Sequence, residues 1–204
     1  MTERDWRIFK EDNDILIKGG RCPEPIRNWD EVKGLTKVVR ENIALNGYKE
    51  PRPIQMQAIP IGMAMQDMIG LAPTGSGKSC AFLLPLVTFL LKQPRIEGNL
   101  IQDGPYAIIM APARELAQQI EKEFVKLTQN TRLRSLVMVG GKSSEEQGSA
   151  ISRGVEVVIG TPGRIYDCLD KRTLVLNQCY FVVLDEADKM IEDNLEETVN
   201  LILD

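Results

Sequence analysis

The chain has 204 residues, of which 43% are hydrophobic and 26% charged, and this suits a soluble α/β domain with an appendage. It contains no histidine, which excludes His-based acid–base catalysis and disfavours a zinc site. The four cysteines form no C-x-x-C pair, so we expect reduced, structural residues of an intracellular protein. A net charge of −4 argues against nucleic-acid binding by bulk electrostatics, so a nucleic acid would have to lie in a local groove.

The first part of the chain predicts an arm followed by two helices. Residues 1–28 carry mixed charge, Gly19-Gly20 and two prolines, which is typical of an extended arm rather than a core element. Apolar positions over 36–46 follow a helical period that Gly47 ends, and Pro53 suits the first turn of a helix through Met65. The first residues are too charged for a secretory signal, and the apolar run over 81–91 is too short to span a bilayer. We therefore expect no membrane partner.

Residues 72–79 match the phosphate-loop pattern G-x-x-x-x-G-K-[ST] except at the first position, where Ala72 replaces glycine. Residues 68–71 before the loop predict a short buried strand, and residues 81–84 after it open a helix whose N-terminus would face phosphates. In such a loop backbone N–H groups surround the phosphates, the lysine reaches their oxygens, and the serine hydroxyl binds Mg²⁺. Cys80 is expected to pack in the helix. A chance Gly/Ser loop is the alternative, which the flanking strand and helix disfavour.

Beyond the phosphate loop, short Val/Ile-rich runs alternate with helical patterns. This alternation is typical of a parallel sheet covered by helices on both faces. Gly, Thr, Pro and Asp residues come directly after the runs, where open α/β sheets bind their ligands. The predicted strands are 106–110, 136–139, 155–159 and 180–184, with a helix over 114–127.

The last predicted strand ends in Asp185-Glu186-Ala187-Asp188. In P-loop NTPases an acidic residue at this place holds Mg²⁺ opposite the phosphate loop. Two adjacent carboxylates can then divide the work: Asp185 serves the metal, and Glu186 orients and deprotonates the attacking water. The alternative is an acidic, solvated strand end, which is common by itself and becomes weak beside Lys78 and Ser79.

Together these segments resemble the DEAD-box RNA helicases. Residues 72–79 look like motif I of that family, 112–117 like motif Ia, Gly140-Gly141 like the GG motif, 161–164 like motif Ib and 185–188 like motif II. Residues 47–55 resemble the Q motif, with Trp29 at the family's upstream aromatic position. The resemblance implies an α/β fold, a RecA-like P-loop NTPase domain over 29–204, preceded by the arm 1–28.

The resemblance also implies roles for particular residues. Lys78, Asp185 and Glu186 would be catalytic, with Mg²⁺ held by Ser79 and, through water, by Asp185. Tyr48 suits stacking on adenine, and the Gln55 amide suits its polar edge, although helix capping is the simpler role for a glutamine there. The implied ATP/ADP-binding set is Trp29, Tyr48, Gln55, Ala72, Pro73, Thr74, Gly75, Ser76, Gly77, Lys78, Ser79 and Asp188. The implied RNA-binding set is Pro112, Arg114, Glu115, Gly140, Gly141, Thr161, Pro162, Gly163 and Arg164, with Lys142 as a further candidate.

Within the family, residues 1–10, 18–20, 25–27, 47–55 and 174–179 look like the spliceosomal DEAD-box ATPase that acts during 5′ splice-site handover. That resemblance implies a nuclear protein with a role in pre-mRNA splicing. Its partners would be RNA, bound through the backbone without sequence readout, and proteins of the spliceosome or of another RNP. We expect a monomer.

Three departures from the family pattern stand out. Ala113 replaces the usual Thr of motif Ia, Ser79 replaces the commoner Thr, and Asn194-Leu195 stands where the family usually has Gly-Phe. The sequence also stops before motif III and before a second RecA-like domain, which predicts an ATP-binding half that does not unwind RNA alone. The alternatives are a docking module that nucleotide merely stabilises, a DEAD-box helicase of another RNA process, and a DNA-directed P-loop motor. The intact Lys78, Asp185 and Glu186 argue against a non-enzymatic module.

Overall fold

A computed structural model of the chain describes residues 1–141 and 149–204. It divides into two compact units, Met1–Phe89 and Leu90–Asp204, and each is described by itself. The division falls inside a helix, and the arm 1–28 and the domain 29–204 stay predictions.

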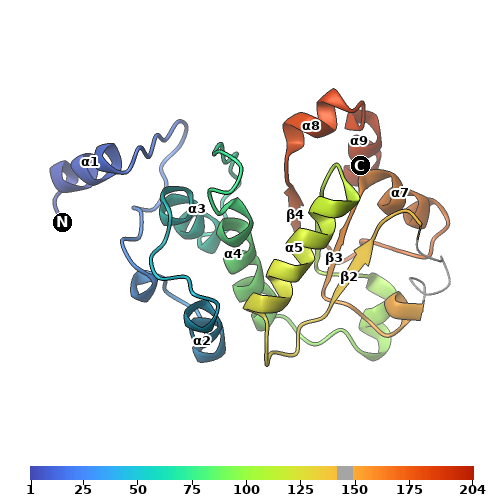
Figure 1. Ribbon diagram of the computed structural model, residues 1–204. Helices are drawn as coiled ribbons and strands as arrows, with labels where there is room; N and C mark the ends of the chain where they lie inside the picture. The colour runs from blue at the N-terminus through green and yellow to red at the C-terminus, as the bar shows by residue number, and fades with distance from the viewer. Residues whose placement is uncertain (142–148) are drawn as a thin grey trace. The chain divides into compact units, whose positions relative to one another are not determined.

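The first unit is helical (Figure 1). Helix α2 (Lys37–Leu45) is capped by Thr36, whose hydroxyl accepts the N–H of Val39 at 3.4 Å. Helix α3 (Pro53–Met63) begins at its proline as predicted, but ends two residues before Met65, which has a left-handed φ of 55°. Helix α4 (Lys78–Lys92) follows the phosphate loop, and the 3₁₀ turn η1 spans Trp29–Glu31. The predicted helices are therefore confirmed, with small shifts at their ends.

The prediction of a buried strand over residues 68–71 is wrong in this structure. The segment has no strand conformation, and Ile69 and Leu71 are 92% and 89% exposed. A parallel strand requires a neighbouring strand to pair with its N–H and C=O groups. Within the described residues of the first unit no strand is present, so this segment remains irregular.

The predicted arm is partly ordered. Residues Glu3–Asp12 form helix α1, capped by reciprocal bonds between Thr2 and Asp5, and none of its side chains is buried. Near residue 28 the arm packs onto α3, because the buried Ile26 donates its N–H to the carbonyl of Met56 at 2.9 Å. That carbonyl is available because Pro60, four residues on, has no N–H to offer it. The arm is thus more structured than its composition suggests.

The second unit is built on a parallel four-stranded sheet, which confirms the predicted α/β class. Its strands are β1 (Ala107–Met110), β2 (Ser135–Met138), β3 (Val157–Gly160) and β4 (Phe181–Leu184), in the order β2-β3-β1-β4. Ala107 lies opposite both Val157 and Phe181. The four predicted runs match these strands to within two residues.

Helices cover both faces of this sheet (Figure 1). On one face α5 (Arg114–Leu127) buries Ala117, Ile120, Phe124 and Leu127. On the other face Ile108 and Val158 join a core cluster with residues of α7 (Pro162–Asp170), α8 (Ala187–Glu192) and α9 (Glu196–Leu203). Successive residues of a strand point to opposite faces, so each strand contributes to both layers.

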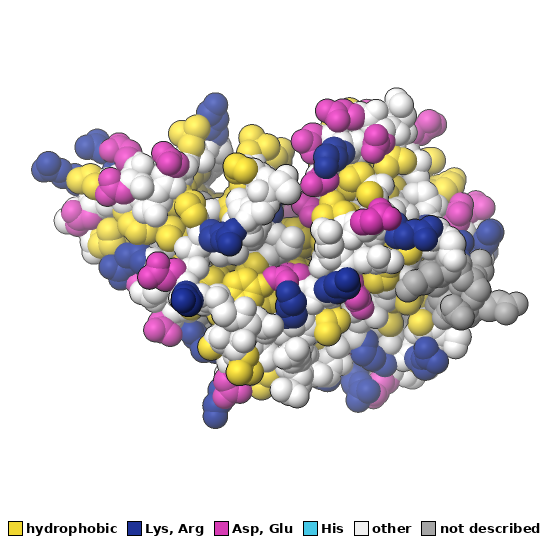
Figure 2. Space-filling view, viewed as in Figure 1, with side chains coloured by type: hydrophobic (Ala, Val, Ile, Leu, Met, Phe, Trp, Pro, Cys, Tyr) yellow, Lys and Arg dark blue, Asp and Glu magenta, His cyan; other side chains and the backbone are white. Residues whose placement is uncertain are grey.

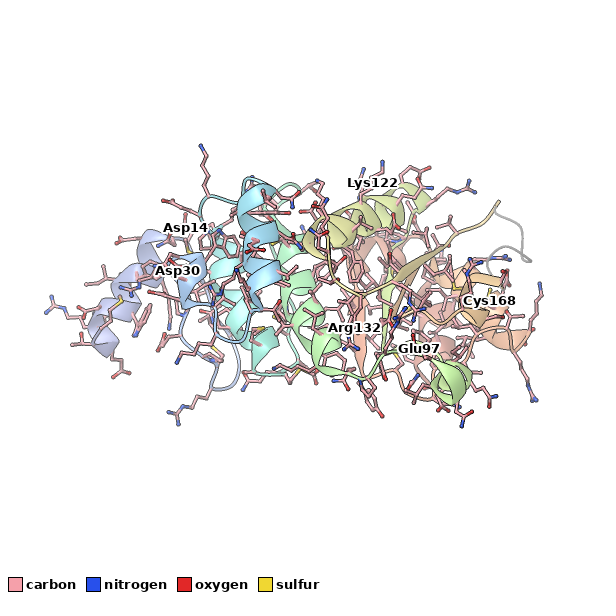
Figure 3. The ribbon with its side chains drawn as sticks, turned by 90° about the horizontal axis from the view of Figure 1, so that it is seen from below. Asp14, Asp30, Glu97, Lys122, Arg132 and Cys168 are labelled. Atoms are coloured by element: carbon pink, nitrogen blue, oxygen red, sulfur yellow. The ribbon has the colours of Figure 1, made fainter. Side chains whose placement is uncertain are left out.

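Two polar contacts fix the connections around this sheet. Arg132 donates to the carbonyls of Leu91 and Gln93 at 3.1 and 2.5 Å, and so caps the end of α4 (Figure 3). The buried Gln178 donates to the carbonyl of Leu100 at 2.8 Å, in the 3₁₀ helix η2 (Gly98–Asp103), and so orders the approach to β4. Among the described residues no helix is long and apolar enough to cross a membrane.

Candidate functional site

The phosphate loop leads directly into the first turn of α4. Gly75 and Gly77 have φ angles of 79° and 93°, which L side chains rarely adopt, and Ser76 closes a turn by donating its N–H to the Pro73 carbonyl at 3.2 Å. The Lys78 ammonium donates to the Ala72 carbonyl and, at 3.3 Å, to that of Pro73. The cation therefore lies inside the loop, where phosphate oxygens would bind.

Two side chains at the start of helix α3 donate hydrogen bonds to carbonyls of the phosphate loop. Gln55 is only 2% exposed and donates its amide N–H to the Gly77 carbonyl at 3.1 Å, while its amide oxygen accepts the N–H of Arg52 at 2.9 Å. The Arg52 guanidinium donates to the Gly75 carbonyl. Both polar atoms of Gln55 are thus engaged within the protein, and its contact with an adenine edge remains a prediction.

Sequence reasoning missed Arg52. Its contact with Gly75 spans 23 residues, and no local pattern reports such a contact. The one available signal was its position directly before Pro53, at the start of a predicted helix. There the Gln55 side chain accepts the backbone N–H of Arg52 and so caps α3.

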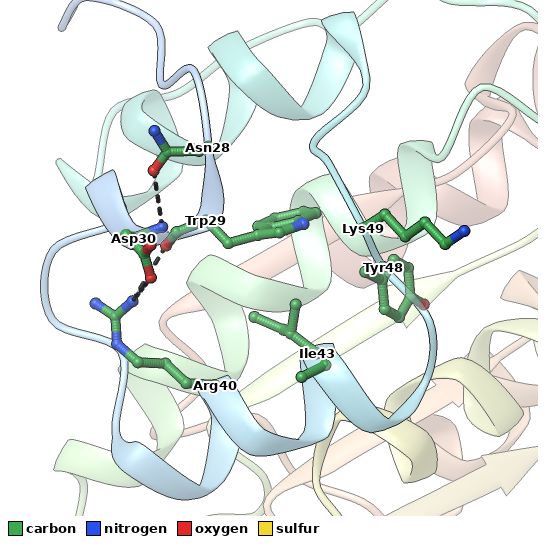
Figure 4. A pocket seen from close by; sticks show the side chains of 8 residues that line it. Asn28, Trp29, Asp30, Arg40, Ile43, Tyr48 and Lys49 are labelled. Atoms are coloured by element: carbon green, nitrogen blue, oxygen red, sulfur yellow. Dashed lines mark hydrogen bonds and ion pairs between the residues drawn. The ribbon is translucent and has the colours of Figure 1, made fainter.

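Trp29 and Tyr48 come together at a pocket of about 280 Å³ in the first unit (Figure 4). Their rings meet edge to face, with centroids 6.2 Å apart and an interplanar angle of 80°. The indole N–H of Trp29 is buried and has no partner within the described residues. Arg40 borders the pocket and pairs with Asp30 at 3.9 Å. Trp29 and Tyr48, both predicted to bind nucleotide, are therefore neighbours, and the Trp29 indole N–H is an unused donor within the described residues.

In the second unit, every predicted RNA-binding or acidic segment follows a strand. Since all four strands are parallel, their carboxyl ends lie at the same edge of the sheet. Residues 112–115 follow β1, 140–141 follow β2, 161–164 follow β3 and 185–188 follow β4. The fold therefore gathers these segments at one edge. Lys142, the remaining RNA-binding candidate, lies outside the described residues.

The acidic segment has two unlike carboxylates. Asp185 is 8% exposed, and its N–H donates to the Met110 carbonyl at 3.0 Å, in register with β1. Glu186 has a left-handed φ of 54° and pairs with Lys189 at 2.7 Å, and this hydrogen bond raises the pKa of the Lys189 ammonium. Asp188 is exposed. A buried carboxylate thus lies beside a partly buried one that pairs with an exposed lysine.

Arg114 lies against the glycine pair. A Cβ added at Gly141 would come within 2.9 Å of an Arg114 guanidinium nitrogen and displace that flexible group, and the φ of 82° itself favours glycine there. A Cβ at Gly140 would meet the Arg114 guanidinium at an ordinary 3.8 Å, and Gly163 faces open space. Thr161 donates its N–H to the Met138 carbonyl at 3.1 Å. Pro112, Glu115, Pro162 and Arg164 lie in the first turns or approaches of α5 and α7. The surface at this edge therefore combines a cation with exposed backbone.

The cysteines contribute no reactive group to the site. Cys80 follows the phosphate loop, is 2% exposed, and burial raises its pKa to about 12, so it stays a protonated thiol. Burial also raises the pKa of Cys179. The expected packing role of Cys80 is confirmed.

A divalent cation would depend on oxygen ligands from the protein and from a phosphate. Within residues 1–141 and 149–204, no three Cys, Asp or Glu side chains lie together as a metal site. Mg²⁺ usually binds one or two carboxylates plus substrate phosphates and water, so it does not need three acidic side chains in one place. Ser76, in the loop, has a buried hydroxyl without a partner in the described residues. The predicted ligands Ser79 and Asp185 each offer an oxygen, as Mg²⁺ requires, and lie in the first and the second unit respectively.

A family model described as DEAD/DEAH box helicase matches residues 52–204. The ATP-dependent RNA helicase ddx23 of Dictyostelium discoideum is 52% identical over 204 residues, and the pre-mRNA-splicing ATP-dependent RNA helicase prp28 of Emericella nidulans is 54% identical over 206. Both comparisons cover 100% of this chain, but only 24% and 26% of the relatives. The chain thus spans about a quarter of the length of the curated relatives it matches.

Solved structures of DEAD-box proteins resemble this chain in fold. The ADP-bound RNA helicase Prp28 of Chaetomium thermophilum superposes with a TM-score of 0.91 at 48% identity, over 100% of this chain and 49% of that one. A DEAD box protein of Methanococcus jannaschii has a TM-score of 0.78 at 33% identity, over 88% and 47% of the two chains.

Proposed function

The chain belongs to the DEAD/DEAH box helicase family, with a RecA-like fold, and on that basis we propose that it is the ATP-binding half of an ATP-dependent RNA helicase. The enzyme would couple ATP hydrolysis to RNA duplex unwinding or RNP remodelling. The observation that carries this proposal is the phosphate loop, whose two left-handed glycines and inward-lying Lys78 open α4. Relatives named as RNA helicases support it.

The nucleotide is ATP, with ADP as product. A solved relative with ADP bound supports this choice, as do Trp29 and Tyr48, which offer aromatic surface to a base. The loop N–H groups and Lys78 bind the phosphates. Mg²⁺ would neutralise charge on the phosphate oxygens, and the Ser79 hydroxyl and, through water, the Asp185 carboxylate would hold it.

Glu186 acts on the attacking water. Catalysis of phosphoryl transfer consists mainly of positioning and charge stabilisation, with one group to orient the nucleophile and accept its proton. The Glu186 carboxylate is partly buried and pairs with the exposed Lys189, and an ion pair with one solvated partner costs little to exchange. It can therefore turn from Lys189 to a water molecule.

RNA binds at the carboxyl edge of the sheet through its backbone. Arg114 and Arg164 suit phosphates, and Gly140, Gly141 and Gly163 let a strand approach closely. Relatives named as pre-mRNA-splicing helicases support a role in splicing, a nuclear location and partners within the spliceosome. We expect the protein to act as a monomer.

The test is ATP turnover of the longer protein that contains this chain, with and without single-stranded RNA, with DNA of the same sequence as control. Stimulation by RNA alone is expected. Equal stimulation by DNA would favour a DNA-directed motor, and no turnover with either polymer would favour a docking module.

A further inference from the structure

The phosphate loop is held at two carbonyls by neighbouring side chains of one helix. Arg52 donates to the Gly75 carbonyl and Gln55 to that of Gly77, both from the start of α3. Gln55 was predicted to belong to the nucleotide site, whereas Arg52 was included only in the segment 47–55 that resembles the Q motif, with no role of its own. The contact of Arg52 is therefore a second, independent link between α3 and the loop.

Peptide geometry turns these two bonds into a constraint on the loop N–H groups. In a trans peptide the N–H points opposite to the C=O of the same unit. A donor that holds the Gly75 carbonyl therefore directs the Ser76 N–H away from α3, and this N–H does bond within the loop, to Pro73 at 3.2 Å. N–H groups that point into a loop are those that bind phosphate.

The stem of Arg52 also limits what the loop can do. Its Cδ lies 3.3 Å from the place where a Cβ on Gly77 would be, and the Gln55 amide nitrogen lies 2.4 Å from that place. The side chains of Arg52 and Gln55 thus fill the space beside Gly77, whose φ of 93° already favours glycine. Arg52 therefore bonds to Gly75 and occupies the space beside Gly77.

From these contacts we infer that Arg52 is a positioning residue of the nucleotide site. It holds the Gly75 carbonyl, and so keeps the loop N–H groups oriented for the phosphates of a nucleoside diphosphate or triphosphate. The inference rests on the proposed nucleotide-binding function. Its effect is preorganisation: the loop is ordered before the ligand arrives, so less order has to be imposed on binding.

The variant that isolates this bond is Arg52→Met, which keeps the apolar stem over Gly77 and removes the guanidinium. Calorimetric titration of the 204-residue chain with ADP should give a Kd about fivefold higher than that of the wild type. Arg52→Lys keeps a donor and should recover part of the affinity. Lys37→Met is the matched control, because Lys37 is a 90% exposed cation of the same unit and pairs only weakly with Glu41 at 3.7 Å. The affinity of this variant for ADP should equal that of the wild type.

Hydrogen–deuterium exchange of the nucleotide-free chain separates positioning from a direct phosphate contact. Positioning predicts faster exchange over residues 72–79 in Arg52→Met before any ligand is added, at an unchanged Tm. Unchanged exchange with a higher Kd would mean that Arg52 only contacts phosphate, and would overturn the inference.

Two further outcomes separate this inference from the function on which it rests. If the wild type binds ADP and Arg52→Met binds it equally well, Arg52 has no role and the proposed function stands. If the wild type itself fails to bind ADP, the proposed function is wrong and the inference falls with it.

Discussion

Lys78 is the residue of the phosphate loop that we expect to change hydrogen-bond partners when a nucleotide binds. In the structure its ammonium donates to two neutral carbonyls, those of Ala72 and Pro73. Phosphate oxygens carry formal charge, and hydrogen bonds between charged groups are stronger than those to neutral acceptors. The exchange of carbonyl for phosphate therefore favours the bound state.

We accordingly expect Lys78→Ala to weaken ADP binding by about 1.5 kcal/mol, roughly tenfold. Calorimetric titration of the two proteins measures this difference. Lys92→Ala removes a lysine from the opposite end of the same helix and should bind ADP like the wild type. Unchanged affinity in Lys78→Ala would remove the phosphate role from this residue.

Glu186 differs from Asp185 because it is only partly buried and pairs with an exposed lysine, Lys189. In the longer protein, Glu186→Gln should leave ATP binding nearly intact and lower turnover by at least about a hundredfold. The amide has the shape of the carboxylate but does not accept a proton from water. A coupled ATPase assay, with binding measured in parallel, checks both parts.

The control for this variant is Glu192→Gln, which removes an exposed carboxylate from the same helix, α8. It should hydrolyse ATP at the wild-type rate. Parental turnover in Glu186→Gln would show that Glu186 is not the base, and the assignment of the acidic segment would need revision.

At the scale of elements, the predictions that depend on local sequence were confirmed. Two features that depend on residues distant in sequence, the irregular segment 68–71 and the contact of Arg52, were not predicted. Helix α2 was predicted because its apolar period and its Thr36 cap are both local. Residues 68–71 have the apolar content of a strand, but strand formation depends on a partner, which their own pattern does not specify. Arg52 was missed for the same reason, since its contact with Gly75 is distant in sequence.

The amino ends of β2 and β3 are joined by a buried ion pair that sequence reasoning did not find. Glu156 is 1% exposed and accepts from Arg134 at 3.0 Å, from the backbone N–H of Arg134 at 2.9 Å and from that of Ile96 at 3.3 Å. Arg134 also donates to the carbonyls of Ile96 and Arg153. These bonds lie at the edge of the sheet opposite to the predicted RNA segments, so their role is structural.

Arg134→Leu should lower the free energy of unfolding by about 2–4 kcal/mol, because it leaves the Glu156 carboxylate buried with backbone donors only. Urea unfolding measures the loss. The double variant Arg134→Leu with Glu156→Leu should recover much of it, since apolar residues often replace a buried pair without loss. Lys122→Ala, which changes an exposed residue of α5, is the control (Figure 3). A cost no greater than that of the control would show that the pair is dispensable.

At the scale of the molecule, charge limits what the chain does with RNA. The net charge is −4, and acidic and basic side chains are intermixed on the face that Figure 2 shows. Each phosphate that a protein neutralises releases counterions, which supplies much of the affinity for nucleic acids. With a local set such as Arg114 and Arg164, the gain from this source is small.

The 204-residue chain alone should therefore show no unwinding of a short RNA duplex, even with saturating ATP. Its RNA affinity should be weak and nearly independent of nucleotide, since coupling needs a second state that both ligands favour. A strand-displacement assay, with RNA binding measured with and without an ATP analogue, tests this. Robust unwinding or tight, ATP-dependent RNA binding would show that one domain suffices.

The central claim, that this chain is an adenine-nucleotide-binding half of a helicase, is tested most directly by calorimetric titration of the chain with ADP and with GDP in the presence of Mg²⁺. The account predicts a single site for ADP and an affinity for GDP at least about tenfold lower, because the donor and acceptor positions on the base edge are reversed in guanine. The Tyr48 and Trp29 pocket would receive the base, and the Gln55 amide would read its edge by exchanging its present bonds to Gly77 and Arg52. Equal affinities for the two nucleotides, or no binding of either, would contradict it.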